Sequence, residues 1–425
     1  MNIFDQLLAD NQIPKFVRVR HEMDRGHIDD IEGAVAQAMR REGTLDRIKP
    51  GDSVCITAGS RDVANIARII RAICDQVKSV GAHPFIIPAM GSHAGAKAEG
   101  QRGIIEGYGV TEEAMGAPIR ASMDTEVIAH SKSGLEIHLD KFANAADFLI
   151  PVGRIKAHTD FRGEVESGIC KMLVIGMGKQ HGAYQCHKLG FKSMAANVKE
   201  FAGAIIEKKP NMFAIGLIEN AYHQTCRIEA IPAGRILAEE PPLLEYAKSR
   251  MAKVPFDQAD ILFVDETGKD ISGAGMDPNV TGRSPVLGIS RPFFQRIAVF
   301  DLTDKSHGNF GGLGSADVTT QRLYRKIDFE QTYPNGITAA EPLAVRLPAV
   351  MPSDRTAMQF ALRTATDCDW EKGPRIVWLK NTLSLSEFYI SEALIPDAEA
   401  LDNVTIVSEP MEVIFDEEGN VKELR

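Results

Sequence analysis

Residues 51–88 contain the pattern that most restricts the fold: a strand, a helix and a second strand joined by short links. The apolar runs 54–57 and 84–88 each predict a buried strand. Between them, apolar residues recur at helical spacing over 63–77, and Gly81 follows where a helix is expected to stop. Two strands connected by one helix form a parallel pair. The chain is therefore expected to build at least one parallel sheet covered by helices.

The same alternation continues toward the C-terminus and predicts an α/β protein. Its 425 residues exceed one ordinary core and suit two domains. We expect two domains with mostly parallel sheets flanked by helices and a cleft between them. The predicted N-terminal domain, 1–255, carries the chemistry, 258–404 closes the cleft, and the tail 405–425 returns to the first domain. Further strands are predicted at 147–151, 212–218, 259–265, 296–300, 375–379 and 404–407, helices at 97–107 and 194–208, a helical link at 239–254, and a final hairpin that turns at Gly419.

Charge and composition restrict the class of partner. The net charge is −10 with both signs mixed along the chain, so no basic face for nucleic acid is evident. No apolar run approaches the roughly 18 residues that span a bilayer, and the N-terminus does not resemble a signal peptide. The six cysteines form no C-x-x-C pair, which favours free thiols in a reducing compartment. We expect a cytoplasmic protein without nucleic-acid or membrane partners, and a homo-oligomer remains open.

Common nucleotide and hydrolase motifs are absent. The sequence Gly176-Met-Gly-Lys-Gln180 lacks the first glycine and the Ser or Thr of a phosphate loop. It also fails as a dinucleotide fingerprint, as does Gly273-Ala-Gly275. Neither H-E-x-x-H nor G-x-S-x-G occurs. The absence of these motifs disfavours a P-loop ATPase, an ordinary NAD enzyme, a zincin and an α/β-hydrolase.

Ionisable residues concentrate in the segment 151–187, directly after a predicted strand. It contains the histidines His158, His181 and His187, together with Lys171 and several other charged residues in a glycine-rich stretch. Glycine lets the backbone approach a ligand closely, and ligands of open parallel sheets bind beyond the carboxyl ends of the strands. The segment therefore predicts a site for an anionic ligand.

The spacing inside this segment resembles the signature of the lactate racemase family, the nickel-pincer nucleotide enzymes. Ser167-Gly168 precedes Lys171, and His187 follows that lysine by sixteen residues. The turn Gly91-Ser92-His93 is similar to the Gly-Thr-His motif of that family. The loop Ala58-Gly59-Ser60-Arg61 is similar to the family loop whose arginine contacts the cofactor phosphate.

The resemblance implies a cofactor, a reaction and a role for each residue. The cofactor would be a nickel-pincer nucleotide, a thiolated pyridinium mononucleotide that holds nickel. The reaction would be racemisation or epimerisation of an α-hydroxy acid or sugar acid by reversible hydride transfer, since an α-hydrogen of this kind is a poor acid. The substrate would be a small anion, and the further partners would be cofactor-maturation enzymes. Lys171 would tether the cofactor, and the residues that help to bind it would be Arg61, Ser60, Gly168 and Lys269. His187 would ligate nickel, with His181 as the alternative ligand. His93 and His158 would be the acid and base.

Several positions depart from the family pattern and indicate a divergent branch. His158 precedes Lys171 by thirteen residues, a longer gap than expected, and Ala58 replaces an acidic residue. Residues 268–279 replace a Tyr-Gln-x-x-Lys element. The substrate therefore stays open, as does the cation for its carboxylate. Arg162, Lys156, Lys269 and Lys305 are the candidates for that cation. The alternatives are a nucleotide-dependent dehydrogenase or lyase on the same scaffold, and a non-catalytic metal- or nucleotide-binding protein.

Overall fold

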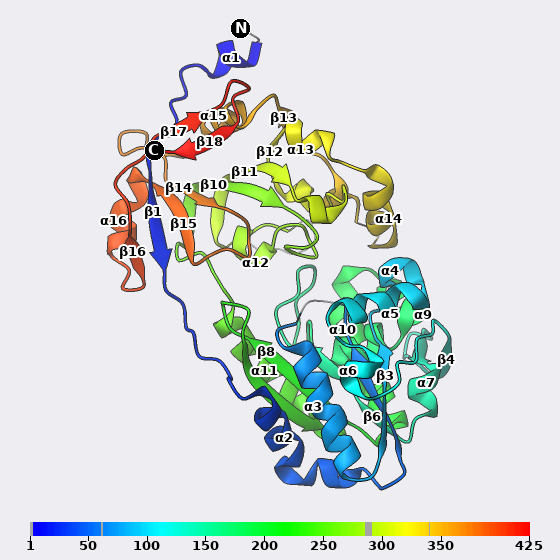
Figure 1. The fold of residues 1–425 in the computed structure, drawn as a ribbon. Helices are drawn as coiled ribbons and strands as arrows, with labels where there is room; N and C mark the ends of the chain where they lie inside the picture. Colours follow the sequence, from blue (N-terminus) through cyan, green and yellow to red (C-terminus); the bar gives the residue numbers. More distant parts are fainter. Residues whose placement is uncertain (1–2, 61–62, 285–290, 340) are drawn as a thin grey trace. The chain divides into compact units, whose positions relative to one another are not determined.

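The computed structural model describes residues 3–60, 63–284, 291–339 and 341–425. The chain forms two compact units (Figure 1). Unit 1 contains Met1–Met23 and Ala252–Arg425, and unit 2 contains Asp24–Met251.

Unit 2 is built around the strand–helix–strand pattern that the sequence predicts. Strand β2 (Ser53–Ala58) pairs in parallel with β3 (His83–Pro88), and α3 (Ile66–Ser79) connects them. The helix buries an apolar stripe that includes Ile69, Ile73 and Val77, as its helical spacing requires. The predicted parallel unit is therefore confirmed.

Two three-stranded sheets carry the centre of unit 2. The first has the order β3–β2–β6, in which β6 (Phe148–Ile150) is parallel to β2. The second has the order β7–β8–β9 and begins at β7 (Val152–Arg154), which Pro151 separates from β6. The side chain of Thr57 in β2 accepts the Val152 amide at 2.8 Å, so the end of β2 is bonded to the start of β7. Loops that follow β2, β3 and β7 are thereby brought to neighbouring positions.

The remaining elements of unit 2 cover these sheets. Helix α10 (Met194–Lys208) spans the residues that the sequence predicts. Helix α11 (Ile236–Arg250) is not a link between domains, because its Leu243, Leu244 and Ala247 pack into the core of unit 2. The other elements are α2 (Ile31–Arg40), η1 (Arg41–Gly43), η2 (Leu45–Arg47), α4 (His93–Ala96), α5 (Ala98–Gly107), α6 (Glu112–Met115), β4 (Thr125–His130), β5 (Glu136–Asp140), α7 (Lys141–Ala145), α8 (Ile169–Lys171), the π-helical turn η3 (Met172–Gly176), α9 (Lys179–His187), η4 (Phe191–Ser193), β8 (Phe213–Glu219), β9 (Thr225–Pro232) and η5 (Ala233–Arg235).

Unit 1 contains an eight-stranded mixed sheet with the order β13–β12–β11–β10–β14–β15–β1–β16. The five strands from β13 to β14 are parallel, and β15, β1 and β16 continue the sheet in antiparallel pairs. Its elements are α1 (Ile3–Leu8), β1 (Phe16–His21), β10 (Gln258–Thr267), α12 (Pro278–Thr281), β11 (Phe293–Leu302), η6 (Asp304–Ser306), η7 (Leu313–Ser315), β12 (Val318–Thr320), α13 (Gln321–Arg325), α14 (Phe329–Ala339), η8 (Pro342–Val345), β13 (Ala349–Met351), α15 (Asp354–Thr364), β14 (Ile376–Leu379), β15 (Glu387–Ser391), η9 (Glu392–Leu394), α16 (Ile395–Glu399), β16 (Val404–Ile406), β17 (Val413–Phe415) and β18 (Val421–Leu424).

Both ends of the chain lie in unit 1, which differs from the predicted domain boundaries. The expectation placed residues 1–23 in the first domain and returned the tail 405–425 to it. Instead, β1 inserts between β15 and β16 through backbone hydrogen bonds. The predicted terminal hairpin, β17–β18, is present, and its Val421 amide donates to the buried Asp354 carboxylate at 2.9 Å. Backbone pairing, which a local pattern does not specify, therefore keeps both ends with the C-terminal half.

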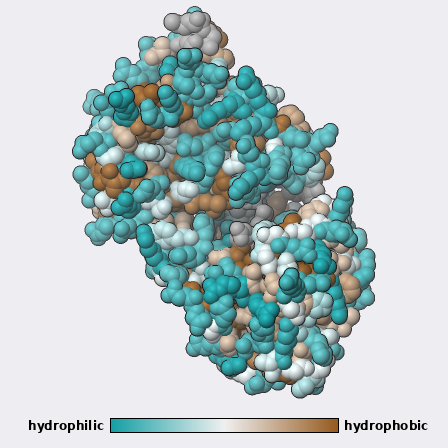
Figure 2. Space-filling model, in the orientation of Figure 1, coloured by the Kyte–Doolittle hydropathy of each residue, from teal (hydrophilic) through white to brown (hydrophobic). Residues whose placement is uncertain are grey.

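The face of the molecule in Figure 2 is mostly hydrophilic, with scattered apolar patches. This agrees with a composition of 25% charged residues, since apolar residues concentrate in the cores. Among the described residues, no helix combines the length and apolarity that crossing a bilayer would need.

Candidate active site in unit 2

Close glycine contacts bring three strand-end loops of unit 2 together. A Cβ at Gly59, after β2, would lie 3.3 Å from Met172 Cε. A Cβ at Gly176 would lie 2.9 Å from the carbonyl oxygen of Ala89, which follows β3. The Gly91 amide donates to the Gly176 carbonyl at 3.4 Å. The loops after β2 and β3 therefore both pack on the helical segment that begins with Lys171.

The loop after β7 folds back on itself and fixes the position of His158. Lys156 and Ser167 form an isolated antiparallel bridge at its base. The fully buried carboxylate of Glu166 accepts the His158 amide at 2.7 Å, and it also pairs with Arg162 at 3.2 Å. The ring of Phe161 stacks on the imidazole with centroids 4.2 Å apart. The sequence cluster thus becomes an ordered loop.

Hydrogen bonds define the protonation form of His158. Its Nδ1 accepts the backbone amide of Asp160 at 2.9 Å, so Nδ1 carries no proton. Burial lowers the pKa of His158 well below its usual value, and the nearby cations Lys156 and Arg162 lower it further. The imidazole is therefore neutral with its proton on Nε2, and this nitrogen lies 2.5 Å from Lys171 Nζ.

Lys171 ends the short helix α8, whose start is held by a buried carboxylate. Glu240 of α11 is fully buried and accepts the Cys170 amide at 2.8 Å. A Cβ at Gly168 would lie 2.1 Å from Glu240 Oε1, so only glycine leaves room for this carboxylate. Burial raises the pKa of Glu240. Gly168 therefore leaves the space that Glu240 needs to bind the start of the helix that carries Lys171.

His187 lies near Lys171, whereas His181 lies near Thr125 of β4. Burial lowers the pKa of His187 to about 4. Its ring packs edge-on against Phe191, and neither ring nitrogen has a hydrogen-bond partner among the described residues. His181, at the other end of α9, approaches Thr125 of β4 at 3.5 Å. Six residues along a helix point in different directions, which separates the two histidines.

The histidine after β3 is paired with the loop after β2. Ser60 Oγ lies 2.5 Å from His93 Nδ1, and His93 is exposed at the start of α4. The Ser60 carbonyl also accepts the Tyr108 hydroxyl at 2.9 Å. Arg61, predicted to hold a phosphate, lies outside the described residues. The structure thus brings together two residues that the sequence analysis took from separate motifs.

Lys269 lies in unit 1, in the loop after β10. Its Nζ donates to the Gly273 carbonyl at 2.5 Å, and its amide donates to Ser306 Oγ at 2.9 Å. Gly268 beside it is enclosed, because a Cβ there would lie 2.1 Å from Thr303 Oγ1. Lys269 is therefore part of two interlocked strand-end loops of unit 1.

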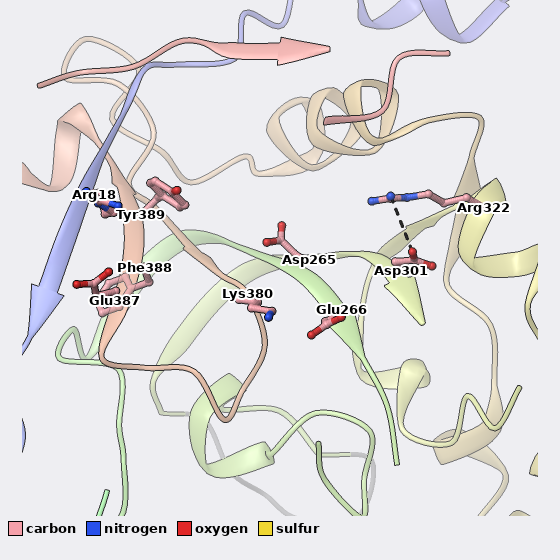
Figure 3. A pocket seen from close by; sticks show the side chains of 9 residues that line it. All are labelled: Arg18, Asp265, Glu266, Asp301, Arg322, Lys380, Glu387, Phe388 and Tyr389. Carbon is pink, nitrogen blue, oxygen red and sulfur yellow. Dashed lines mark ion pairs between the residues drawn. The ribbon is translucent and has the colours of Figure 1, made fainter. Parts of the chain in front are cut away.

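Unit 1 also contains a cavity of about 450 Å³, shown in Figure 3. Its lining includes no histidine, cysteine, serine or predicted site residue, and Asp301 pairs there with Arg322. Burial raises the pKa of Asp265 to about 6, and the Trp378 indole donates to this carboxyl at 2.5 Å. The lining residues are Arg18, Asp265, Glu266, Asp301, Arg322, Lys380, Glu387, Phe388 and Tyr389. This mixture of charges offers neither a metal-ligand set nor a nucleophile, so unit 2 is the better candidate.

The residues of unit 2 fit a tethered cofactor that brings most of its own metal ligands. Among the described residues, no group of three His, Cys, Asp or Glu side chains can hold a metal ion. A neutral imidazole without a hydrogen-bond partner is nevertheless available at His187, and imidazole suits nickel. Lys171 offers an amine near this imidazole. The donor set therefore matches one protein ligand and one attachment point.

Sequence reasoning missed the buried carboxylates that support the site. Glu166 is one of the other charged residues of the segment 151–187, and it is fully buried and also pairs with Lys248 at 3.0 Å. Glu240 stands directly before Pro241-Pro242 in a stretch interpreted as a helical link. Nothing local distinguishes either residue from a solvated glutamate, since burial is decided by distant partners.

Comparisons with solved structures show a likeness in fold. No protein-family model matches the sequence, and no curated protein matches it. Among solved structures, the fold is similar to the lactate racemase apoprotein from Thermoanaerobacterium thermosaccharolyticum, with a TM-score of 0.53 and 14% sequence identity. The match covers 87% of this chain and 99% of that chain. The chain therefore shares the fold of that racemase, and identity this low extends no further than the fold.

Proposed function

We propose that this chain is a racemase or epimerase of an α-hydroxy acid or sugar acid that uses a nickel-pincer nucleotide tethered to Lys171. The observation that carries the proposal is that Lys171, His158 and His187 lie near one another in unit 2. The shared fold with a lactate racemase apoprotein supports the same reading.

Each protein residue has a chemical task in this proposal. The tethered group, when bound, would supply the hydride acceptor, which no protein side chain provides. His187 would hold nickel through its neutral imidazole, and Lys171 would carry the covalent link. Ser60 and Arg61 would hold the phosphate. Gly168 would leave room for Glu240, which holds the helix that carries Lys171.

The two proposed acid–base histidines differ in how the protein holds them. The Asp160 amide holds His158 in the form with a proton on Nε2, which suits giving a proton to a substrate oxygen. His93 would then take the hydroxyl proton, with Ser60 orienting its ring at Nδ1. In the reverse direction the two roles exchange. Lys156 and Arg162 add positive charge near His158 and favour an anionic substrate.

The decisive experiment measures cofactor loading in a host that makes the cofactor. We expect an adduct of a few hundred daltons on the Lys171 peptide, together with nickel in the intact protein. Lys171→Arg, which keeps a long basic side chain but has no free amine, should remove both. His187→Ala should remove nickel and keep the adduct, whereas the matched variant His181→Ala should keep both. Wild-type protein without nickel and with an unmodified Lys171 would refute the proposal.

A second measurement tests the reaction itself. Loaded protein should racemise or epimerise at least one member of a panel of enantiopure α-hydroxy and sugar acids. With substrate deuterated at the α-carbon, hydride transfer returns the same atom, so the product should retain deuterium. Replacement of that deuterium by solvent hydrogen would indicate proton removal instead and would contradict the proposed chemistry.

A further inference from the structure

The hydrogen bonds of His158 determine what its neighbour Lys171 can be. The Asp160 amide can only donate, so it occupies the Nδ1 lone pair of His158. The neutral ring must then place its proton on Nε2. Phe161 stacked on one face and Glu166 bonded to the His158 amide hold this orientation.

Lys171 Nζ faces that Nε2–H group at 2.5 Å. An ammonium group has three donors and no acceptor, so it would set two donors against each other at this distance. A free amine has a lone pair that accepts the Nε2 proton. Only the uncharged form of Lys171 satisfies the contact.

We propose that the tautomer of His158 holds Lys171 as an uncharged, nucleophilic amine in the chain before anything is attached to it. The inference deepens the proposed function, on which its biological meaning rests, because a covalent tether needs a lone pair on this nitrogen. The loop after β7 would thus prepare the attachment point in advance, through a histidine that later serves in acid–base chemistry.

The charges around the pair favour the same state. Lys156 and Arg162 are the nearby cations that act on His158, and Asp160 is the acidic group that acts on His187. Positive neighbours disfavour a further positive charge on the amine. The fully buried carboxylate of Glu166 is already paired with Arg162.

Competitive acetylation of the full, unmodified chain tests the charge state directly. The probe is a trace of isotopically labelled acetic anhydride, and peptide mass spectrometry compares Lys171 with the exposed Lys208 at the end of α10. In each reaction the amine nitrogen forms a bond to one carbonyl carbon. The bond from that carbon to the acetate oxygen breaks, acetate leaves with the electron pair, and the nitrogen releases one proton to solvent.

The pH dependence of the rate separates charge from access. An ordinary lysine is uncharged in only about one molecule in 10³ at pH 7, so its rate rises roughly tenfold per pH unit. We expect Lys208 to follow that slope between pH 6 and 9 and Lys171 to stay nearly constant. Shielding by the loop would lower the Lys171 rate equally at every pH and leave its slope unchanged. A Lys171 slope equal to that of Lys208 would overturn the inference.

A matched pair of variants tests the origin of the effect. His158→Glu places a carboxylate opposite the amine, which stabilises ammonium, so Lys171 should regain the slope of Lys208. His181→Glu makes the same change on α9 near Thr125 and should leave the Lys171 slope flat. A flat slope in His158→Glu would refute the role of His158. These measurements need no cofactor, so missing nickel or adduct would count against the proposed function alone.

Discussion

Lys179 and Asp140 form an ion pair in the core of unit 2, and its loss should be measurable. The two side chains are fully buried with Nζ and Oδ2 3.1 Å apart, and Nζ also donates to the Pro88 carbonyl at the end of β3. Lys179 begins α9, the helix that ends at His187. The pair therefore joins the strand that precedes His93 to the helix that carries the proposed nickel ligand.

Replacing Lys179 by Met keeps the aliphatic volume and leaves the Asp140 charge buried without its cation. Such a loss costs about 3–5 kcal/mol in other proteins. Asp140 would keep two amide donors, from Phe142 at 2.7 Å and Ala143 at 3.0 Å. These donors place the expected loss near the lower end, about 3 kcal/mol.

Urea unfolding distinguishes the two units because both tryptophans, Trp370 and Trp378, lie in unit 1. Circular dichroism follows helices of both units, whereas tryptophan fluorescence follows unit 1. Lys179→Met should lower the free energy of unfolding in the dichroism transition of unit 2. The matched variant Lys208→Met, at an exposed site, should change it by less than about 0.5 kcal/mol. Adding Asp140→Asn should recover part of the loss.

A loss below about 1 kcal/mol in Lys179→Met would refute the reasoning, since it would mean that the Asp140 charge finds solvent or another partner. Failure of the double variant to recover stability would likewise show that the effect is not electrostatic.

Three further outcomes can be measured on the same protein. Burial raises the pKa of Asp354 to about 6, so its contribution to stability is complete below the unfolded pKa and is lost as pH rises toward 6. The tryptophan-detected stability of wild type minus that of Asp354→Asn should therefore fall from pH 4 to pH 7. Gly176→Ala should lower the thermal midpoint of unit 2, because the new Cβ would lie 2.6 Å from Met172 Sδ; overpacking of this kind costs about 1–3 kcal/mol. Gly168→Ala should displace Glu240 and lower the thermal midpoint of unit 2, and it should leave the unfolding transition of unit 1 unchanged. An unchanged midpoint of unit 2 would contradict the tight fit of Glu240 against Gly168.

The periodic elements were predictable because their signals are local. Apolar spacing identified β2, α3 and β3, and it placed α10 at its observed bounds. The terminal hairpin was also predictable, since Gly419 takes the left-handed conformation, with φ of 84°, that its turn needs. Strand β1 was missed, although its alternation of buried Val17 and Val19 with exposed Arg18 and Arg20 was a usable signal.

For the candidate site, the sequence by itself determined which chemical groups are present and their order along the chain. Their roles remain proposals. Only the tertiary structure decided that Lys171 meets His158 across thirteen residues, that His93 meets Ser60, and that His181 faces Thr125. It also decided that Glu166 and Glu240 are buried supports and that both chain ends lie in unit 1. The physical reason is range: helix and strand patterns arise from neighbours a few residues apart, whereas burial, tautomer and charge state depend on partners from distant segments.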